Sequence, residues 1–364
     1  MSDHKKKVIV GMSGGVDSSV AALLLKEQGY DVTGVTMEIW PQADPCDIEQ
    51  EGGCCGLSAV EDAKRVASVI GIPHYVMNFR QIFEESVIRD FVDSYRAGRT
   101  PNPCIVCNRV VKWEALLAKS MALGADYIAT GHYARIEQMP SGRIGLRRQG
   151  AGQREAAYKD QTYALYSLTQ NQLAHTLFPL GEYTKDEVRQ IAEKASLPVA
   201  HKPDSQDICF VPDGDYARFI SEYTGEADQP GHFVTEEGEV LGTHKGITHY
   251  TVGQRKGLGL AMGEPVYVRE IRPQTNEVVV GEDKKSRVVK AHQISFLSIE
   301  DLPDRWVVDA RIRYNHAGAR ALASRTGEDE ITCFFEEEQR AVTPGQALVL
   351  YDEDGYVLGG GTII

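Results

Sequence analysis

A seven-residue loop rich in glycine and serine lies near the start of the chain, between a short apolar run and an amphipathic segment. The loop reads Ser-Gly-Gly-Val-Asp-Ser-Ser over residues 13–19. The apolar run, Lys7–Met12, predicts a buried strand, and Asp17–Gln28 predicts a helix. Glycine lets a phosphate approach the main chain closely, and a helix N-terminus offers unpaired N–H groups and the positive end of a dipole. The loop therefore predicts a phosphate site. It has neither the Walker A ending nor the dinucleotide spacing of glycines.

The first half of the chain alternates predicted strands with predicted helices. Further strands are expected at Asp31–Glu38, His74–Phe79 and Tyr127–Thr130, and helices at Ala59–Ile70, Ile82–Ala97 and Lys112–Leu123. This alternation predicts an α/β fold with a parallel sheet covered by helices on both faces. After about Asp215, short β-branched and aromatic runs are separated by glycine-rich turns. We therefore expect an α/β domain over residues 1–216, a central β-rich domain over 217–288 and a C-terminal β-barrel-like domain over 289–364.

The composition excludes several classes of protein. With 364 residues, 42% of them hydrophobic and 25% charged, the chain is not disordered, collagen-like or a coiled coil. No apolar run approaches the roughly 18 residues of a membrane span, and Lys5–Lys7 precede a run too short for a signal peptide. We therefore expect a cytoplasmic protein with no membrane partner. An odd number of cysteines without a secretion signal favours metal or redox chemistry: Cys46, Cys54, Cys55, Cys104, Cys107, Cys209 and Cys333.

Two of these cysteines, Cys104 and Cys107, form a C-x-x-C motif in a stretch that contains two prolines. The prolines predict an extended segment ahead of a helix that starts near Lys112. A cysteine just ahead of a helix N-terminus has a lowered pKa, and the thiolate is the reactive form. Cys209 ends a short apolar run, which predicts a strand that returns to the edge of the first domain.

Several motifs, taken in order, resemble the bacterial tRNA 2-thiouridylases, which belong to the ATP pyrophosphatase (PP-loop) family. The loop matches that family's S-G-G-x-D-S pattern, and the similarity continues to the end of the chain. The matching segments are Ser13–Ser18, Pro101–Asn108, Gly131–Arg135, Lys159–Gln161, Asp204–Phe210, Tyr250–Gly259, Arg311–Tyr314 and Val342–Gln346. The resemblance implies that the α/β domain is a nucleotide-binding and catalytic domain of the PP-loop type.

The resemblance also implies a reaction. The C2 oxygen of the wobble uridine of tRNA is a poor leaving group, so ATP first converts it to an adenylate and pyrophosphate is released. A nucleophilic sulfur then attacks C2 and AMP departs. Cys209 would carry this sulfur as a persulfide, received from a donor protein. Cys107 would release it and leave a Cys107–Cys209 disulfide.

The same resemblance assigns two sets of binding residues. The ATP site would comprise Gly11, Met12, Ser13, Gly14, Gly15, Val16, Asp17, Ser18, Met37 and Gly131, with Asp17 holding Mg²⁺ together with the pyrophosphate. The tRNA site would comprise Asn102, Pro103, Cys104, His132, Lys159, Asp160, Gln161, Arg313, Tyr314 and Gln346. The carboxyl ends of parallel strands are where an open α/β sheet binds nucleotides, which agrees with the first set.

Cys104 departs from the family pattern, because several relatives carry Asp at this position. Three thiols, Cys104, Cys107 and Cys209, could jointly bind an iron–sulfur cluster or zinc, so cluster chemistry with free sulfide is an alternative route to the same product. Two further alternatives are another PP-loop synthetase that forms AMP and uses ammonia, and an RNA- or metal-binding module without activity. Cys54 and Cys55 are interpreted as part of a structural loop.

The charge of the chain is at odds with a tRNA partner. The 39 basic and 52 acidic residues give a net charge of −13, which argues against a protein that coats nucleic acid. Basic residues nevertheless cluster, and if they share one face they could neutralise tRNA phosphates. The clusters are Arg143, Arg147, Arg148 and Arg154; Lys245, Arg255 and Lys256; Lys284, Lys285 and Arg287; and Arg311, Arg313 and Arg320.

Overall fold

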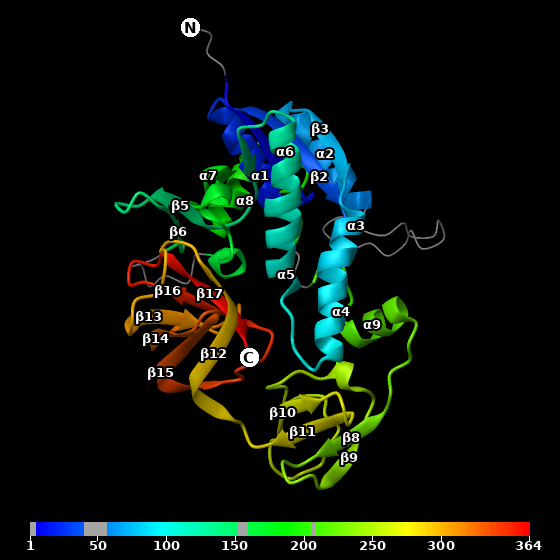
Figure 1. Cartoon of the computed structure of the whole chain (residues 1–364). Helices are drawn as coiled ribbons and strands as arrows, with labels where there is room; N and C mark the ends of the chain where they lie inside the picture. The colour runs from blue at the N-terminus through cyan, green and yellow to red at the C-terminus, as the bar shows by residue number, and fades with distance from the viewer. Residues whose placement is uncertain (1–4, 40–56, 151–158, 205–207) are drawn as a thin grey trace. The chain divides into compact units, whose positions relative to one another are not determined.

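The computed structural model describes residues 5–39, 57–150, 159–204 and 208–364, which belong to two compact units. Unit 1 consists of residues 1–86, 104–212 and 354–357. Unit 2 consists of residues 87–103, 213–353 and 358–364. Figure 1 traces the chain through its elements by colour.

Unit 1 is built on a five-stranded parallel sheet with the strand order β3-β2-β1-β4-β7. The strands are β1 (Lys7–Gly11), β2 (Asp31–Glu38), β3 (His74–Asn78), β4 (Tyr127–Ala129) and β7 (Thr176–Leu177). Val10 of β1 pairs with Gly34 on one side and with Ala129 on the other. The strand order reverses between β1 and β4, and such a reversal is where open α/β sheets bind ligands at the carboxyl ends of their strands.

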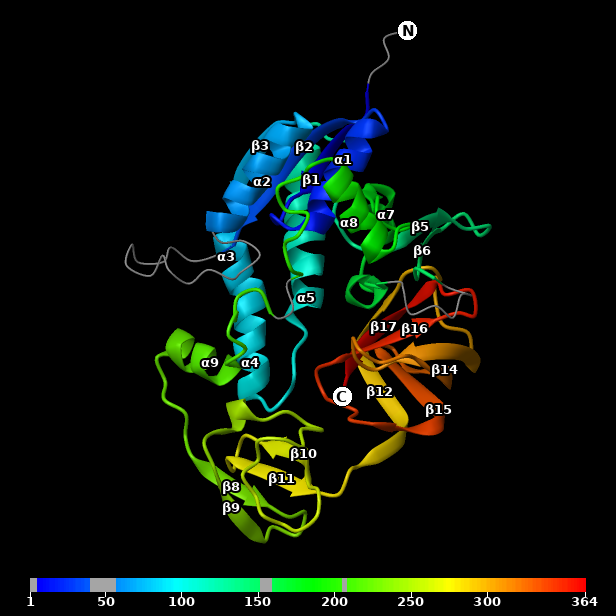
Figure 2. The ribbon, with the colours of Figure 1, turned by 180° about the vertical axis from the view of Figure 1, so that it is seen from behind.

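Helices cover both faces of this sheet. One face packs against α1 (Val16–Glu27), α2 (Leu57–Ile70) and α8 (Lys185–Lys194), which share a core with Val8 and Val10. Strand residues alternate between faces, so the buried Ile9 lies on the opposite side, where α6 (Leu117–Ala122) contacts β4 (Figures 1 and 2). Unit 1 also contains a hairpin of β5 (Arg135–Gln138) and β6 (Ile144–Arg147), the 3₁₀ helix η3 (Thr162–Leu165), and α7 (Gln170–Ala174).

The helix that carries the C-x-x-C motif begins nine residues earlier than predicted, at Pro103 rather than near Lys112. Helical structure is continuous through α5 (Pro103–Val106), the π-helical segment η2 (Cys107–Leu116) and α6. The prediction of an extended segment here was wrong, because Pro103 occupies the first helical position. Proline is favoured at that position, since its fixed φ suits a helix and its missing N–H would have no partner there.

Unit 2 contains two β structures, two α-helices and the 3₁₀ helix η4 (Ile247–His249). The α-helices are α4 (Arg89–Arg96), which continues the chain from α3 (Arg80–Phe83) and the π-helical η1 (Glu84–Ile88), and α9 (Tyr216–Thr224). Phe91 of α4 stacks edge-on against Tyr216 of α9, with ring centroids 5.8 Å apart. The first β structure is a four-stranded sheet with the order β10-β11-β8-β9, from β8 (Gly231–Val234), β9 (Val240–His244), β10 (Tyr267–Arg272) and β11 (Glu277–Gly281).

The second β structure is a closed six-stranded barrel with the order β12-β15-β14-β13-β16-β17. Its strands are β12 (Lys285–Phe296), β13 (Trp306–Arg311), β14 (Ala319–Gly327), β15 (Glu330–Arg340), β16 (Ala347–Tyr351) and β17 (Val357–Ile363). Inward-facing apolar side chains, among them Ile331, Cys333 and Phe335 of β15, fill the barrel. The predicted fold class, a parallel α/β domain followed by two β-rich modules, is confirmed. No helix in the described part of the chain has both the length and the apolar character needed to cross a membrane.

Candidate functional site

The glycine-rich loop joins β1 to α1 at the carboxyl end of the central strand. Gly15 is the N-cap of α1, and no side chain caps the helix there. Gly14 has a φ of +67°, and a Cβ at this position would lie 2.4 Å from the main-chain oxygen of Ala59. Only glycine fits such a position. The loop therefore presents the N-terminal N–H groups and the positive dipole end of α1 to its surroundings, which suits a phosphate.

Hydroxyl groups hold this loop in shape. The N–H of Ser13 donates to Oγ of Ser18 at 3.1 Å, and the hydroxyls of Ser18 and Ser19 donate to the main-chain oxygen of Gly15 at 3.3 Å and 2.8 Å. Ser18 and Ser19 are buried, whereas Ser13 is exposed. The exposed Ser13 hydroxyl lies 3.4 Å from Oγ of Ser18.

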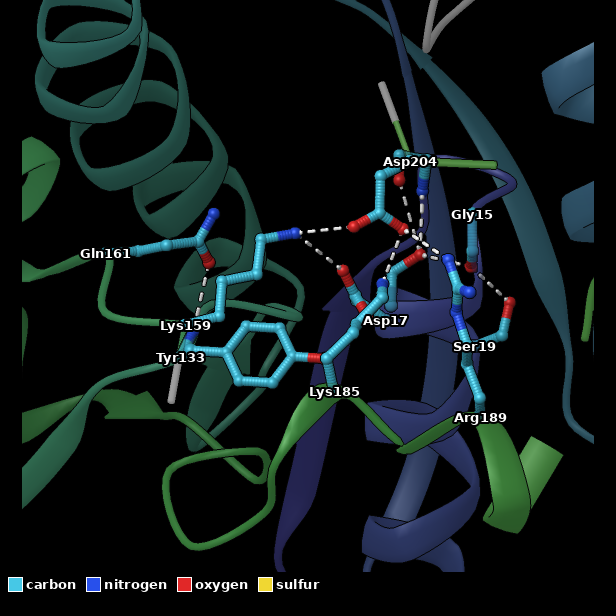
Figure 3. A network of polar contacts seen from close by, with 11 residues as sticks. Gly15, Asp17, Ser19, Tyr133, Lys159, Gln161, Lys185, Arg189 and Asp204 are labelled. Carbon is cyan, nitrogen blue, oxygen red and sulfur yellow. Dashed lines mark hydrogen bonds and ion pairs between the residues drawn. The ribbon is translucent and has the colours of Figure 1, made fainter. Parts of the chain in front are cut away.

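Asp17, in the first turn of α1, lies at the centre of a polar network (Figure 3). Its Oδ1 atom accepts a hydrogen bond from the hydroxyl of Tyr133 at 2.7 Å and one from Nζ of Lys185 at 2.6 Å. Its Oδ2 atom lies 3.7 Å from Nζ of Lys159. Three segments that are far apart in sequence therefore converge on the first turn of α1.

A second carboxylate, that of Asp204, contacts the same two lysines. Its Oδ1 atom lies 2.6 Å from Nζ of Lys185, and its Oδ2 atom accepts from Nζ of Lys159 at 2.9 Å. Arg189 of α8 lies 3.6 Å from Oδ1 (Figure 3). Burial would raise the pKa of Asp204, but the hydrogen bonds from Lys185 and Lys159 outweigh it and lower the pKa to about 2. Asp204 is therefore ionised under all ordinary conditions.

Tyr133 is fixed from two sides. Its main-chain N–H donates to the side-chain oxygen of Gln161 at 3.0 Å, and Nζ of Lys159 lies 5.6 Å from the centre of its ring. Burial first, and the Asp17 carboxylate second, raise the pKa of Tyr133 well above its usual value. The hydroxyl thus remains a proton donor to Asp17. Gly131 packs directly beneath α1, since a Cβ there would lie 2.6 Å from the N atom of Ser18.

The other predicted nucleotide-binding residues lie at the carboxyl ends of β1 and β2. Gly11 ends β1, and the buried Met12 donates its N–H to the main-chain oxygen of Val35 at 2.8 Å. Met37 is half-buried near the end of β2 and pairs with Met77 of β3. Because the strands are parallel, Met37 lies at the same edge of the sheet as the loop.

His132 lies between Gly131 and Tyr133 in the sequence, and aromatic rings lie close to it. Its ring centroid is 5.6 Å from that of Trp113 and 6.0 Å from that of Phe178, and Nδ1 lies 2.7 Å from the hydroxyl of Thr130. Burial, followed by the charges of Lys112 and Lys159, holds the pKa of His132 well below its usual value. The ring is therefore neutral at physiological pH.

The two cysteines of the C-x-x-C motif lie inside the helix that starts at Pro103, not ahead of it. Cys104 is exposed and Cys107 is half-buried. They are three residues apart, so both side chains project from one side of the helix. Both cysteines therefore lie in the first two turns of the helix.

Cys209 is half-buried in a turn, and the described residues 208–210 do not form the strand predicted here. The N–H of Val211 donates to the main-chain oxygen of Ile208 at 2.9 Å, which closes the turn. Within residues 5–39, 57–150, 159–204 and 208–364, no group of three or more His, Cys, Asp or Glu side chains is arranged to hold a metal ion. Cys46, Cys54, Cys55 and Arg154 lie outside these residues.

The residues of Lys159–Gln161, predicted to contact tRNA, have three different environments. Lys159 faces the two carboxylates and Gln161 holds Tyr133. Asp160 accepts from the N–H and the hydroxyl of Thr162 at 3.1 Å and 2.8 Å, which fixes the start of η3. The first two therefore belong to the network around Asp17.

Five other predicted tRNA contacts fall in unit 2: Asn102, Pro103, Arg313, Tyr314 and Gln346. Gln346 donates from its side-chain amide to the main-chain oxygens of Thr100 and Pro101, directly ahead of Asn102. Arg313 donates to the main-chain oxygen of Arg340 at 3.1 Å, and the side chain of Tyr314 is exposed.

Sequence reasoning assigned no role to Tyr133, Lys185, Arg189 or Asp204, although Tyr133 and Asp204 lie within segments that match the family pattern. One signal for Lys185 was present: Lys185 follows the N-cap Thr184 as the first residue of α8. A cation at a helix N-terminus is repelled by the positive end of the helix dipole, so we expect an anion nearby that stabilises it. Lys202 was also missed. Its Nζ lies 2.7 Å from Asp62 of α2 and donates to the main-chain oxygen of Gly14 at 3.2 Å, which ties the loop to α2.

Three family models match consecutive parts of the chain. The model described as a tRNA methyl transferase HUP domain matches residues 6–213, one described as a tRNA methyl transferase PRC-barrel domain matches 217–282, and one described as an aminomethyltransferase β-barrel domain matches 286–363. The first covers more than half of the chain.

Curated relatives match the chain from end to end. A protein of Lachnoclostridium phytofermentans is 59% identical over 361 residues, which is 99% of this chain and 99% of the relative. A protein of Carboxydothermus hydrogenoformans is 54% identical over 362 residues, 99% of this chain and 98% of the relative. Both relatives are named tRNA-specific 2-thiouridylase MnmA.

Proposed function

The chain belongs to the tRNA-specific 2-thiouridylase family, and we propose that it catalyses the ATP-dependent 2-thiolation of the wobble uridine of tRNA. The observation that carries this proposal is the convergence of Lys159 and Lys185 on Asp17 at the N-terminus of α1. Two cations and a helix N-terminus around a glycine-rich loop suit a polyphosphate. An adenylating reaction needs such a site, whereas a module that only binds RNA does not.

In the first step, O2 of the uridine attacks the α-phosphorus of ATP, the bond to the β-phosphate oxygen breaks and pyrophosphate leaves. Gly14, Gly15 and the exposed hydroxyl of Ser13 face the departing pyrophosphate, and Lys159 and Lys185 stabilise its charge. Adenine lies against Gly11, Met12, Met37 and Gly131 at the carboxyl edge of β1, β2 and β4. Val16 follows the two loop glycines and precedes Asp17. Its side chain is buried and anchors α1.

Asp17 fits the role of a magnesium ligand. A carboxylate oxygen is the donor that Mg²⁺ prefers, usually beside substrate phosphates. Oδ1 of Asp17 has close contacts with Tyr133 and Lys185, while the contact that Oδ2 makes among the described residues is the longer one with Lys159. Oδ2 is therefore the atom that would bind the metal. When bound there, magnesium would neutralise charge on the pyrophosphate.

In the second step, the sulfur comes from a persulfide on Cys209, loaded by a sulfur-donor protein. The terminal sulfur attacks C2, the C2–O2 bond breaks and AMP leaves with the oxygen. The thiolate of Cys107 then attacks the sulfur of Cys209, so that 2-thiouridine is released and a Cys107–Cys209 disulfide remains. A dithiol reductant restores the two thiols for the next turnover.

The substrate tRNA is proposed to contact both units. In unit 1 the contacts are Cys104, His132, Lys159, Asp160 and Gln161, and in unit 2 they are Asn102, Pro103, Arg313, Tyr314 and Gln346. The exposed ring of Tyr314 is suited to stacking on an unpaired base. Lys159 also contacts Asp17 and Asp204, so it would link tRNA binding to the polyphosphate.

The test is thiolation of unmodified tRNA by anaerobically purified protein with Mg-ATP and a persulfide donor, measured as 2-thiouridine by nucleoside mass spectrometry. Cys209→Ala and Cys107→Ala are expected to lose thiouridine, and Cys209→Ala to lose the protein-bound persulfide.

Cys104→Ala is the variant that distinguishes persulfide chemistry from cluster chemistry. Persulfide chemistry leaves it substantial activity, whereas a cluster held by Cys104, Cys107 and Cys209 needs all three thiols. AMP formation without any thiouridine would refute the sulfur-transfer step alone.

A further inference from the structure

We propose that Asn108 is a positioning residue for the release of sulfur: its buried amide fixes the main chain beside Cys107 and holds the helix that carries this cysteine against η3. The proposal rests on the function proposed above, in which the thiolate of Cys107 attacks the sulfur of Cys209. Asn108 touches no reacting atom and acts through the residue next to it.

The first argument is that the Asn108 side chain is buried and bonded at both ends. It is only 3% exposed. Its Nδ2 atom donates to the main-chain oxygen of Ala164 in η3 at 2.9 Å, and its Oδ1 atom accepts from Nζ of Lys112 at 2.8 Å. A carbonyl oxygen can only accept and an ammonium group can only donate, so a flipped amide would lose both bonds. The main chain at Asn108, and with it the adjacent Cys107, is therefore fixed against η3.

The second argument is the kind of helix in which Asn108 lies. Cys107 is the first residue of the π-helical segment η2, and Asn108 is the second. Turns of π-helix are rare, and many of them lie at functional sites. Further along η2, the buried Trp113 donates from Nε1 to the hydroxyl of Thr176 at 2.8 Å. Asn108 supplies the corresponding anchor at the end of η2 that carries Cys107.

The third argument is that Ala164 belongs to the network around Asp17. Ala164 donates its N–H to the main-chain oxygen of Gln161 at 3.1 Å, and Gln161 exchanges hydrogen bonds with the main chain of Tyr133. The hydroxyl of Tyr133 donates to Asp17 at 2.7 Å (Figure 3). A continuous series of hydrogen bonds thus joins the helix of the C-x-x-C motif to the first turn of α1. Removing the Asn108 amide breaks only the last of these bonds, so we expect adenylation to persist.

The step that Asn108 supports follows a covalent intermediate. Once the terminal sulfur of the Cys209 persulfide has bonded to C2, enzyme and tRNA are joined through an S–S bond. The thiolate of Cys107 breaks this bond and forms a new S–S bond with Sγ of Cys209. The electron pair of the broken bond stays on the sulfur attached to C2, and N3 takes up a proton, which gives 2-thiouridine. If Cys107 is misplaced, the protein–tRNA adduct accumulates.

The test is a single turnover without reductant, in which full-length protein, loaded with persulfide and then freed of the donor, meets unmodified tRNA and Mg-ATP. AMP, 2-thiouridine and the protein–tRNA adduct are measured together, the adduct on a denaturing gel without reductant. Asn108→Ala removes both contacts of the amide. Asn108→Asp keeps a partner for Lys112 but places a carboxylate oxygen opposite the oxygen of Ala164, and it carries the test if Asn108→Ala does not fold.

In both variants we expect thiouridine to fall about ten- to a hundredfold, AMP formation to stay close to that of the wild type, and an adduct that dithiothreitol cleaves to accumulate. Cys107→Ala is the positive control for the adduct. Thr176→Val is the matched control for lost stability, because it removes the buried partner of Trp113 and leaves both contacts of Asn108 in place. Its ratio of thiouridine to AMP is expected to equal that of the wild type.

A second readout needs neither tRNA nor nucleotide. Because Cys107 is half-buried, loosening the start of η2 should expose its thiol. We expect iodoacetamide to alkylate Cys107 severalfold faster in Asn108→Ala than in the wild type or in Thr176→Val, as measured by peptide mass spectrometry.

A wild-type ratio of thiouridine to AMP in the Asn108 variants, or an unchanged alkylation rate of Cys107, would overturn the proposal. An equal fall of that ratio in Thr176→Val would overturn it too, since the effect would then be one of general stability. Joint loss of AMP and thiouridine in Asn108→Ala would show that Asn108 supports the nucleotide site and not sulfur release. An absent adduct in Cys107→Ala would instead refute the proposed sulfur-transfer step.

Discussion

The side-chain amide of Gln346 donates a hydrogen bond to the main-chain oxygen of Thr100 at 3.0 Å, across 246 residues of sequence. The same amide reaches the oxygen of Pro101 at 3.1 Å, and Thr100 returns its N–H to the oxygen of Pro344 at 2.9 Å. Gly345 permits this approach, since a Cβ there would lie 2.8 Å from the oxygen of Thr100. Within unit 2, the segment ahead of Asn102 is thus attached to the barrel.

Replacing Gln346 by leucine tests whether this contact is structural. Two acceptors lose their donor, and each such loss costs about 0.5–1.5 kcal/mol, so we expect the free energy of unfolding to fall by about 1–3 kcal/mol. The KM for tRNA rises severalfold because the segment before Cys104 is no longer held. Chemical denaturation and steady-state thiolation measure the two effects. The control is Gln229→Ala, at an exposed site. Unchanged stability with lost tRNA affinity would show that Gln346 acts through its proposed contact with tRNA and does not stabilise the fold.

Gly131→Ala is expected to distort the nucleotide site through volume alone. The new Cβ would meet the N atom of Ser18 at 2.6 Å and the main-chain carbon of Asp17 at 2.7 Å, so the first turn of α1 has to move. Overpacking of this kind costs about 1–3 kcal/mol, and ATP-dependent activity should fall with it. Gly11→Ala is the control for unfolding, because a Cβ there finds no atom closer than 3.8 Å. Equal stabilities of the two variants would contradict the packing argument.

Tyr133→Phe removes only the hydroxyl that donates to Asp17. The ring remains fully buried and Lys185 still pairs with Asp17, so the fold should persist. Asp17 loses one of the donors that orient it, and we expect kcat/KM for ATP to fall about tenfold, equivalent to about 1.4 kcal/mol. AMP formation in the presence of tRNA provides the measurement. Tyr127→Phe, in β4, should retain wild-type kinetics. If both variants behave alike, the Tyr133 hydroxyl has no special role.

His132 predicts an acid sensitivity of the fold. Its folded-state pKa lies well below the ordinary value of 6.5, so the unfolded chain binds a proton that the folded chain does not. Below pH 6.5, stability should therefore fall as pH falls, by up to about 1.4 kcal/mol per pH unit, until the folded pKa is reached. His132→Phe, which keeps an aromatic ring beside Trp113, should reduce this slope. Unfolding at a series of pH values measures it, with His201→Gln at an exposed position as the control.

The main elements of the α/β unit could be predicted because their signals are local. Apolar and amphipathic runs located β1, α1, β2 and α2, and β2 has the predicted bounds Asp31–Glu38. The helix at Pro103 was missed because two closely spaced prolines are also typical of extended chain. The prediction of a strand at Cys209 did not hold for residues 208–210, because an apolar run of this length is also typical of a turn packed against a core.

The loop of the candidate site could be identified from sequence, but its partners could not. Tyr133 and Lys185 lie 116 and 168 residues from Asp17 along the chain, and no spacing rule relates residues that only the sheet order brings together. Asp204 was noted as part of a motif, yet its two lysines are visible only in three dimensions. The family resemblance assigned residues to ligands, whereas the geometry shows which of these residues contact one another.

The barrel closes by pairing β12, its first strand in sequence, with β17, its last; Ala291 lies opposite Ile363. During synthesis, β12 therefore leaves the ribosome long before its second neighbour exists, and the barrel cannot close until residues 357–363 have also emerged. The parallel sheet of unit 1 has all its strands by Leu177 and faces no such delay. A nonsense codon between β12 and β17 would thus yield a chain with a complete parallel sheet in unit 1 but an open, aggregation-prone barrel.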